Sequence, residues 1–214
     1  MISHALTIVT SELNRHLSDH YQSEHTVVTQ ARLGNFSEGF SCSPSEAEII
    51  RDSIYLSVVN IQEEKTLKNL PHYSVNNTSL TTTYENPAVF INLLILMTAT
   101  HKNYAAALSN LSRIIRFFQF NNVFTQDTVA PLSISNTTIH ELDQLESFKL
   151  IFDLYSPSLE EVNHLWGTLG GKQYPFVLYK LRMLDLQFKA VLGEGGLIEE
   201  VVTNFSHKTR ENHV

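Results

Sequence analysis

The stretch that decides the fold runs from Glu85 to Tyr104 and reads ENPAVFINLLILMTATHKNY. It contains the longest apolar run in the chain, and Asn92 lies in the middle of that run. Only about a dozen residues between 87 and 100 are apolar, whereas a membrane-spanning helix needs about 20. Pro87 and Asn92 disfavour such a helix further. The run is therefore typical of a strand that is buried on both faces of a sheet.

The segments around this strand predict an alternation of helices and strands. Apolar residues at helical spacing predict helices over 2–20 and 102–118, and a Ser158–Glu161 capping box begins a third helix. Period-two alternation predicts further strands, over 25–33, 53–61, 146–155 and 174–190. This order predicts an α+β fold, with one largely antiparallel sheet flanked by helices.

Two of these elements carry a finer pattern. The expected inner stripe of the helix over 102–118 consists of Tyr104, Leu108, Leu111, Ile115 and Phe118. In the last strand the apolar phase changes, because Tyr179 and Leu181 are in one phase while Leu184 and Leu186 are in the other. Such a change predicts a bulge or a passage between two environments.

The expected domain organisation is a main domain over 1–192 and a C-terminal tail or small docking segment over 193–214. The boundary rests on the Gly-rich sequence GEGG, which begins at Gly193 and is typical of a hinge. The polar stretch over 63–86 is expected to be a long connection, because it exceeds the length of a tight hairpin loop.

Composition excludes several classes of function. The chain has 214 residues, 43% of them hydrophobic, and a net charge of −7, which argues against nucleic acid or an anionic membrane as a partner. The single cysteine, Cys42, excludes an internal disulfide and provides no zinc-binding set. The first residues lack the pattern of a signal peptide. No phosphate-binding loop or catalytic motif is present, so no cofactor is expected.

Candidate catalytic or metal-binding groups are few. His16 and His20, and separately Glu160 and His164, are four residues apart, which is a spacing that metal ligands use on helices. No further ligand accompanies either pair, so a solvated helix face is the preferred interpretation. The chain is therefore expected not to be an enzyme, and a hydrolase that uses these residues is kept as an alternative.

Two long stretches carry a resemblance to a known family. They are ENPAVFINLLILMTATHKNYAAALSNLSRIIRFFQFNNVFT, residues 85–125, and SPSLEEVNHLWGTLGGKQYPFVLYKLRML, residues 156–184. With the start MISHALTIVTSELNRHL, they resemble the cap, or tail terminator, proteins of extracellular contractile injection systems, which are phage-tail-like particles of the antifeeding-prophage and virulence-cassette type. The residues that carry the resemblance are Asn86, Pro87, Asn92, Gln119, Asn163, Trp166, Pro175, Tyr179 and Arg182. Ala88 and Phe176 depart from the pattern, since the family often has Pro and Ser there.

The resemblance implies a structural protein that ends the inner tube and the sheath at the end distal to the baseplate. It implies a sixfold ring of copies, contacts with the tube and sheath proteins, and a fold similar to that of phage tail terminators. It also implies assembly in the cytoplasm, followed by residence in the particle, with no cofactor, nucleic acid or membrane. A tube-initiating or baseplate adaptor protein is the alternative within the same particle.

The resemblance also assigns expected roles to particular residues and edges. Strand addition by the sheath is expected at the 25–33 strand or at the outer half of the 176–190 strand. Asn86 and Pro87 are expected to set the turn before the long strand. Three polar residues are expected to be buried and to fix packing through backbone hydrogen bonds: Asn92, Gln119 and Asn163. Trp166 is expected to anchor the third helix in the core, and Arg182 to pair with a carboxylate across a subunit boundary. A contribution to the stability of the fold alone would explain the presence of each of these residues equally well.

Overall fold

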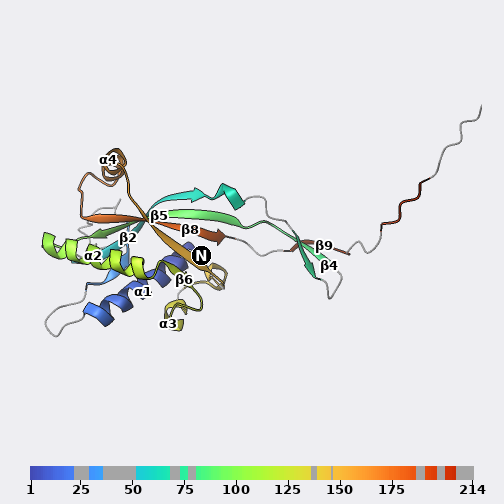
Figure 1. Cartoon of the computed structure of the whole chain (residues 1–214), viewed down its shortest axis with the longest axis horizontal. Coiled ribbons are helices and arrows are strands. Elements are labelled where there is room, and N and C mark those ends of the chain that lie inside the picture. Colours follow the sequence, from blue (N-terminus) through green and yellow to red (C-terminus); the bar gives the residue numbers. More distant parts are fainter. Residues whose placement is uncertain are drawn as a thin grey trace, which may run out of the picture. The chain divides into compact units, whose positions relative to one another are not determined.

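A computed structural model describes residues 1–21, 29–35, 52–67, 73–76, 81–135, 139–145, 147–186, 191–196 and 201–205 (Figure 1). The chain divides into two compact units, of which the first comprises Met1–Lys68 and Val89–Leu186, and the second Asn69–Ala88 and Gln187–Val214. The first unit contains α1 (Ile2–Tyr21), β1 (Ala31–Leu33), β2 (Ile54–Glu63), η2 (Lys65–Leu67), β5 (Val89–Ala99), α2 (Tyr104–Phe120), β6 (Val123–Thr125), α3 (Pro131–Ile134), η3 (Glu141–Asp143), β7 (Lys149–Tyr155), α4 (Leu159–Thr168) and β8 (Phe176–Leu186). The second contains β3 (Tyr73–Asn76), β4 (Thr81–Glu85) and β9 (Val191–Gly196).

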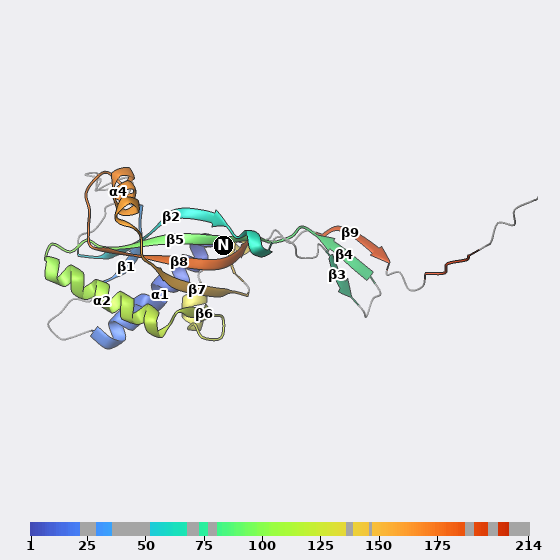
Figure 2. The same cartoon turned by 45° about the horizontal axis from the view of Figure 1, so that its top comes forward.

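The first unit is built on one six-stranded sheet in the order β1-β2-β5-β8-β7-β6. Every pair of neighbours is antiparallel except β1 and β2, which run parallel. Helices α1 and α2 cover one face, and α4 lies on the opposite face (Figures 1 and 2). The expected α+β class, with a largely antiparallel sheet flanked by helices, is confirmed.

Strand β5, the stretch that opened the sequence argument, is buried on both faces. Leu93, Ile95 and Met97 join the core beneath α1 and α2, while Leu96 joins a second cluster with Trp166 beneath α4. Each of these side chains is at most 4% exposed. The two-faced burial predicted from the apolar run is confirmed. Among the described residues, no helix is long and apolar enough to cross a membrane.

Strand β8 contains the bulge that its change of phase predicted. Ile91 of β5 pairs with Leu184 and Leu93 pairs with Leu181, so two β8 residues lie opposite the single residue Asn92. Leu181 and Leu184 both belong to the core beneath α1 and α2, although an odd separation along a regular strand would place them on opposite faces. The extra residue therefore keeps both apolar phases on one face.

Helix α2 is rotated relative to the expected stripe. Its buried side chains are Ala107, Asn110, Leu111, Ile114, Phe117 and Phe118. Tyr104, Leu108 and Ile115, which were expected to face inward, are 40–67% exposed. Leu111 and Phe118 of the expected stripe are buried, so periodicity identified part of the buried face and misplaced the rest. At its C-terminal end, the Phe118 ring stacks on that of Phe152 with 4.8 Å between centroids.

Two buried polar side chains of α1 fasten the segment between β6 and β7. His4 accepts a hydrogen bond at Nδ1 from the Leu145 N–H (2.8 Å), and its Nε2 contacts the Ile134 carbonyl at 2.8 Å. The Glu12 carboxylate accepts from the Ala130 N–H and the Ser133 hydroxyl, at 3.0 and 2.8 Å. These side chains give the buried backbone groups of an irregular segment the partners they need.

The second unit contains a three-stranded antiparallel sheet in the order β3-β4-β9. Tyr73 and Tyr84 are cross-strand partners, and their ring centroids are 6.5 Å apart. The long polar connection expected over 63–86 contains two strands that its sequence did not reveal, since polar, Thr-rich residues there form the β3–β4 hairpin. The predicted hinge at Gly193 is wrong, since GEGG lies within β9 and pairs with β4. The expected domain boundary after residue 192 falls inside this strand, and a separate role for 193–214 stays a prediction.

Candidate assembly surfaces

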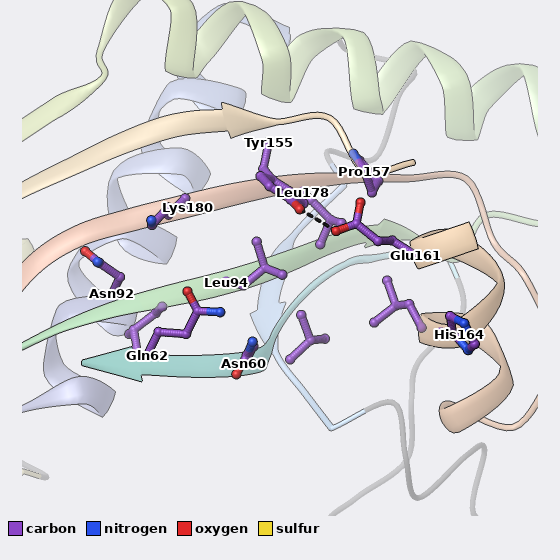
Figure 3. A pocket seen from close by; sticks show the side chains of 13 residues that line it. Asn60, Gln62, Asn92, Leu94, Tyr155, Pro157, Glu161, His164, Leu178 and Lys180 are labelled. Atoms are coloured by element: carbon purple, nitrogen blue, oxygen red, sulfur yellow. Dashed lines mark hydrogen bonds between the residues drawn. The ribbon is translucent and has the colours of Figure 1, made fainter. Parts of the chain in front are cut away.

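The outer face of the main sheet, opposite α1 and α2, carries a groove (Figure 3). Its cavity volume is about 360 Å³, and its lining comes from β2, β5 and β8, from Tyr155 at the end of β7, and from α4 with the loop before it. Leu94 and Leu178 form part of its apolar floor, and Lys180, Asn92 and Gln62 lie at the end away from α4. Because α4 covers only part of this face, an apolar floor remains beside a polar sheet surface.

Asn92 belongs to a side-chain network at the polar end of the groove. Asn92 is 4% exposed, and its Nδ2 donates to the Glu64 carboxylate at 2.7 Å. The Thr66 hydroxyl and N–H donate to the same carboxylate, at 2.6 and 3.3 Å. The bonds from Thr66, then Asn92, lower the pKa of Glu64 from its ordinary 4.5 to about 2. Asn92 is buried as expected, but this partner is a side chain of the segment after β2.

Helix α4 is held at its N-terminus by the predicted capping box. Ser158 Oγ accepts from the Glu161 N–H at 3.2 Å, and the Glu161 carboxylate accepts from the Ser158 N–H at 2.7 Å. The Tyr155 hydroxyl donates to the same carboxylate at 2.8 Å (Figure 3). The Ser158 N–H is the largest cause of the lowered pKa of Glu161, followed by the Tyr155 hydroxyl. The helix end that forms one wall of the groove is therefore fixed to β7.

Arg182 and Lys180 are the cationic side chains of β8, and they differ in their partners. Arg182 Nε lies 2.6 Å from a carboxylate oxygen of Asp153 on β7, so its ion pair lies within the chain rather than across the expected subunit boundary. Lys180 lines the groove and makes no hydrogen bond or ion pair within the described ranges of the chain. Among the described residues, Lys180 is therefore the cation that lines the groove without an ion pair, and its charge contributes to the lowered pKa of Glu64.

The two end strands of the main sheet are short, and side chains occupy their outer edges. On β1, the Asn14 amide of α1 both accepts from the Ala31 N–H (2.6 Å) and donates to the Ala31 carbonyl (2.9 Å). On β6, the Thr128 hydroxyl accepts from the Thr125 N–H at 2.9 Å, and the Thr128 and Val129 N–H groups donate to the Thr125 carbonyl. Both edges thus lack the row of free backbone groups that strand addition requires.

The predicted strand-addition sites change accordingly. Within the expected 25–33 strand, only Ala31–Leu33 is a strand, and residues 25–28 lie outside the described residues. Ala31 is already occupied by Asn14. The outer half of β8 is paired with β5 through Leu186, but among the described strands its other neighbour, β7, pairs only as far as Arg182.

The remaining residues of the resemblance have mixed environments. Trp166 is 4% exposed and anchors α4 on Leu96 and Leu178, as predicted. Gln119 and Asn163 are exposed, so their predicted burial is wrong. Both lie on the outward side of an amphipathic helix, where a polar side chain needs no protein partner. The other four residues occupy the expected places. Asn86 and Pro87 lie in the short exposed segment before β5. The Pro175 carbonyl, at the start of β8, accepts a hydrogen bond from the Ala99 N–H, and Tyr179 is buried.

Of the candidate metal-binding residues, His164 lines the groove from α4, whereas Glu160, His16 and His20 do not line it. His164 Nε2 and a Glu160 oxygen are 3.7 Å apart, with side chains 78% and 85% exposed, as on a solvated helix face. His16 and His20 have ring centroids 4.6 Å apart. The described residues contain no group of three or more His, Cys, Asp or Glu side chains placed to hold a metal ion. Cys42 lies outside the described residues.

The first unit is an α+β domain with a groove on the outer face of its sheet, and the second unit is a small antiparallel sheet. The sequence from residue 5 to residue 200 matches the Pvc16 N-terminal domain family, and the chain belongs to this family. The family expected from the resemblance is thereby confirmed. No curated protein matches the sequence significantly.

Solved structures with a similar fold come from contractile injection particles. One is described as the sheath/tube terminator of the PVC extracellular contractile injection system in its extended state, with a TM-score of 0.56, 12% identity, and coverage of 96% of this chain and 64% of that one. Another is the tube-terminating cap of the anti-feeding prophage, with a TM-score of 0.49, 15% identity, and coverage of 92% and 60%. The chain thus spans about 64% of the length of the first relative and 60% of the second.

Proposed function

We propose that this protein is the cap, or tail terminator, of an extracellular contractile injection system. It forms a ring, six copies around, that binds the last layer of inner tube and sheath at the end distal to the baseplate and stops both from growing. The observation that carries this function is membership of the Pvc16 N-terminal domain family over 5–200, together with a terminator fold that aligns over 96% of the chain. The protein is structural, with no catalytic role.

The physical reason for a cap is the open-ended geometry of the tube. Rings stacked head to tail expose the same growing face after every addition, so growth continues until a different protein occupies that face. A cap must match the last ring on one side and offer no copy of the growing surface on the other. The groove and the second sheet of this chain are the proposed surfaces for such contacts.

The second unit is the proposed contact for the tube or sheath. β3 and β9 are the outer strands of its sheet, and each pairs with β4 on one side among the described strands. Tyr73, Val75 and Tyr84 are 43–55% exposed, which is high for large apolar side chains. A sheath arm that adds beside β3 or β9 would extend this sheet and cover those side chains. This proposal replaces β1 as the strand-addition site expected from the sequence, and through β9 it keeps the C-terminal region as a contact.

The test is a comparison of particles made with and without this protein. Assembly takes place in the cytoplasm, so particles are purified from producing cells and their lengths are measured by electron microscopy. Particles without the protein are expected to have variable tube lengths or unstable sheaths, and the wild-type gene should restore a single length. Normal length and sheath stability in its absence would refute the cap function. Localisation of the labelled chain at the baseplate end would instead support an adaptor.

A further inference from the structure

Among the described residues, part of the edge of β2 is unpaired, although side chains occupy the outer edges of both end strands of the main sheet. Strand β2 runs from Ile54 to Glu63, but β1 pairs only with Ile54–Leu56. The Glu64 N–H donates to the Phe90 carbonyl of β5. Because backbone N–H and C=O groups point alternately to the two sides of a strand, and the pairing from Asn60 to Glu64 is regular, the Ile61 N–H and carbonyl point away from β5. Within the described chain no strand pairs with this side of Val58–Gln62.

The open edge of β2 adjoins the groove. Val59, Asn60 and Gln62 line the groove from β2, and Ile61 on the other face is 54% exposed. A strand added beside Val58–Gln62 would therefore direct alternate side chains onto the groove face, next to an apolar floor. This combination of a free backbone edge and adjacent apolar floor is absent from the occupied edges of β1 and β6.

Lys180 is a cationic side chain in the lining of the groove, so it can pair with a carboxylate of an occupant. The Glu64, Glu161 and Asp153 carboxylates already accept hydrogen bonds or an ion pair from Thr66 and Asn92, from Ser158 and Tyr155, and from Arg182. Lys180 makes no hydrogen bond or ion pair among the described residues, although its charge contributes to the lowered pKa of Glu64 and it lies opposite Asp153 on β7. Its half-buried position beside Leu94 and Leu178 reduces solvent screening.

The chain itself contains a segment of matching chemistry. Residues 201–205 lie outside helices and strands, and Val201, Val202 and Phe205 are 77%, 70% and 95% exposed. Val, Thr and Phe favour strands, and a run of exposed apolar side chains is typical of a segment that binds another protein surface. Two carboxylates, Glu199 and Glu200, directly precede them in the sequence.

We propose that residues 197–205 of a second copy bind this site. The segment adds as a strand beside Val58–Gln62, its apolar side chains cover the groove floor, and Glu199 or Glu200 pairs with Lys180. Each copy gives a segment to one neighbour and receives one from the other, which is the head-to-tail contact that closes a ring. The inference rests on the self-assembly in the proposed function, and it names the surfaces that join the copies.

The test is a charge exchange between two full-length variants, read as self-association by sedimentation velocity. Lys180→Glu places a carboxylate against the wild-type segment, and the double variant Glu199→Lys, Glu200→Lys places lysines against the wild-type groove. Each variant alone is expected to associate about tenfold or more weakly than the wild type. An equimolar mixture is expected to recover association, because every groove then finds a segment of opposite charge.

Controls keep the result interpretable. Lys172→Glu makes the same charge change on an exposed residue outside the groove and should leave association unchanged. If Lys180→Glu fails to fold by circular dichroism, Lys180→Gln replaces it and should still weaken association. A synthetic peptide of residues 196–206 should compete with ring formation, and the same peptide N-methylated at alternate residues should not, since it cannot pair as a strand.

Several outcomes would overturn the inference. They are a wild-type chain that stays monomeric at every concentration, single variants that associate like the wild type, and a mixture that fails to recover association. If the segment instead docks on the groove of its own chain, mixing the two variants would not recover association. Particle length is a separate measurement, so rings and normal caps formed by both charge variants would refute the groove contact and leave the cap function standing.

Discussion

The Asn92 amide donates to the Glu64 carboxylate at 2.7 Å, joining the middle of the central apolar strand to the segment that follows its neighbour β2. The bond gives a buried polar group a partner and holds a carboxylate in its charged form. A lowered carboxyl pKa contributes stability that is present above the ordinary 4.5 and is lost as pH falls through about 2.

Asn92→Leu should therefore raise the pKa of Glu64 towards its ordinary value. The loss of one donor to the charged form is the cause, and an NMR titration of the Glu64 carboxyl carbon measures it. Glu64→Gln should remove the dependence of stability on pH between about 4.5 and 2 that this group contributes. Gln62→Ala, opposite Asn92 on β2, is the matched control and should leave the titration in place.

His4→Leu should destabilise the chain by about 2–4 kcal/mol, because it removes a buried side-chain partner and leaves the Leu145 N–H and Ile134 carbonyl unsatisfied. The measurement is urea unfolding followed by circular dichroism. His164→Ala removes an exposed histidine and should change stability by less than about 0.5 kcal/mol. Equal effects of the two substitutions would contradict the fastening role of His4.

Tyr179 should make the fold sensitive to alkali. Burial raises the pKa of Tyr179 from 10.0 to about 12, so the protonated form is favoured in the folded chain. The contribution of Tyr179 to the free energy of unfolding is fully present below pH 10. It falls by about 2–3 kcal/mol in total as the pH rises from 10 to 12. Tyr179→Phe should remove that part of the loss in urea unfolding at pH 9 to 12, and Tyr104→Phe, at a 67% exposed site, should not.

Trp166→Ala should cost about 3–5 kcal/mol, since it opens a cavity between α4 and the sheet. Trp166→Phe should cost much less than a typical loss of a buried tryptophan, because the indole Nε1 is buried without a hydrogen-bond partner. Thermal unfolding compares the two. A phenylalanine variant as unstable as the alanine variant would indicate a hydrogen bond to the indole.

Asn14→Ala should expose the backbone of an end strand. The Ala31 N–H and carbonyl would both lose their partner, so β1 would present free groups to other chains. We expect faster aggregation on mild heating, measured by light scattering, in addition to a loss of stability of about 1–3 kcal/mol. Asn163→Ala, at an exposed position of α4, is the control and should aggregate at the wild-type rate.

Local patterns predicted much of this fold because their causes are local. The central strand, the bulge in β8 and the capping box each follow from the spacing of a few residues, and each is confirmed. The rotation of α2 and the exposure of Gln119 could not be predicted, because two apolar stripes compete and only packing against the sheet chooses between them. The β3–β4 hairpin was missed for a related reason, since its strands are polar and bury little.

The groove could not be predicted from the sequence either. Lys180, Tyr155 and Asn92 come from three strands, and only the order of the sheet brings them to one face. The edge-blocking roles of Asn14 and Thr128 likewise depend on distant backbone groups or turn geometry. The one local signal near the groove was the capping box, which fixes Glu161 but gives no indication of Tyr155 as its second partner.

The bulge in β8 gives this strand one residue that its inside–outside pattern does not need. Removing one residue between Leu181 and Leu184 would leave the two leucines two positions apart, so a regular ladder would still pair Leu184 with Ile91 and keep it on the core face. Loss of the extra residue would therefore change the length of the strand without reversing which of its downstream side chains face the core. Homologous chains are expected to tolerate either count between these two leucines, so an alignment of distant relatives needs room for a one-residue gap at this place.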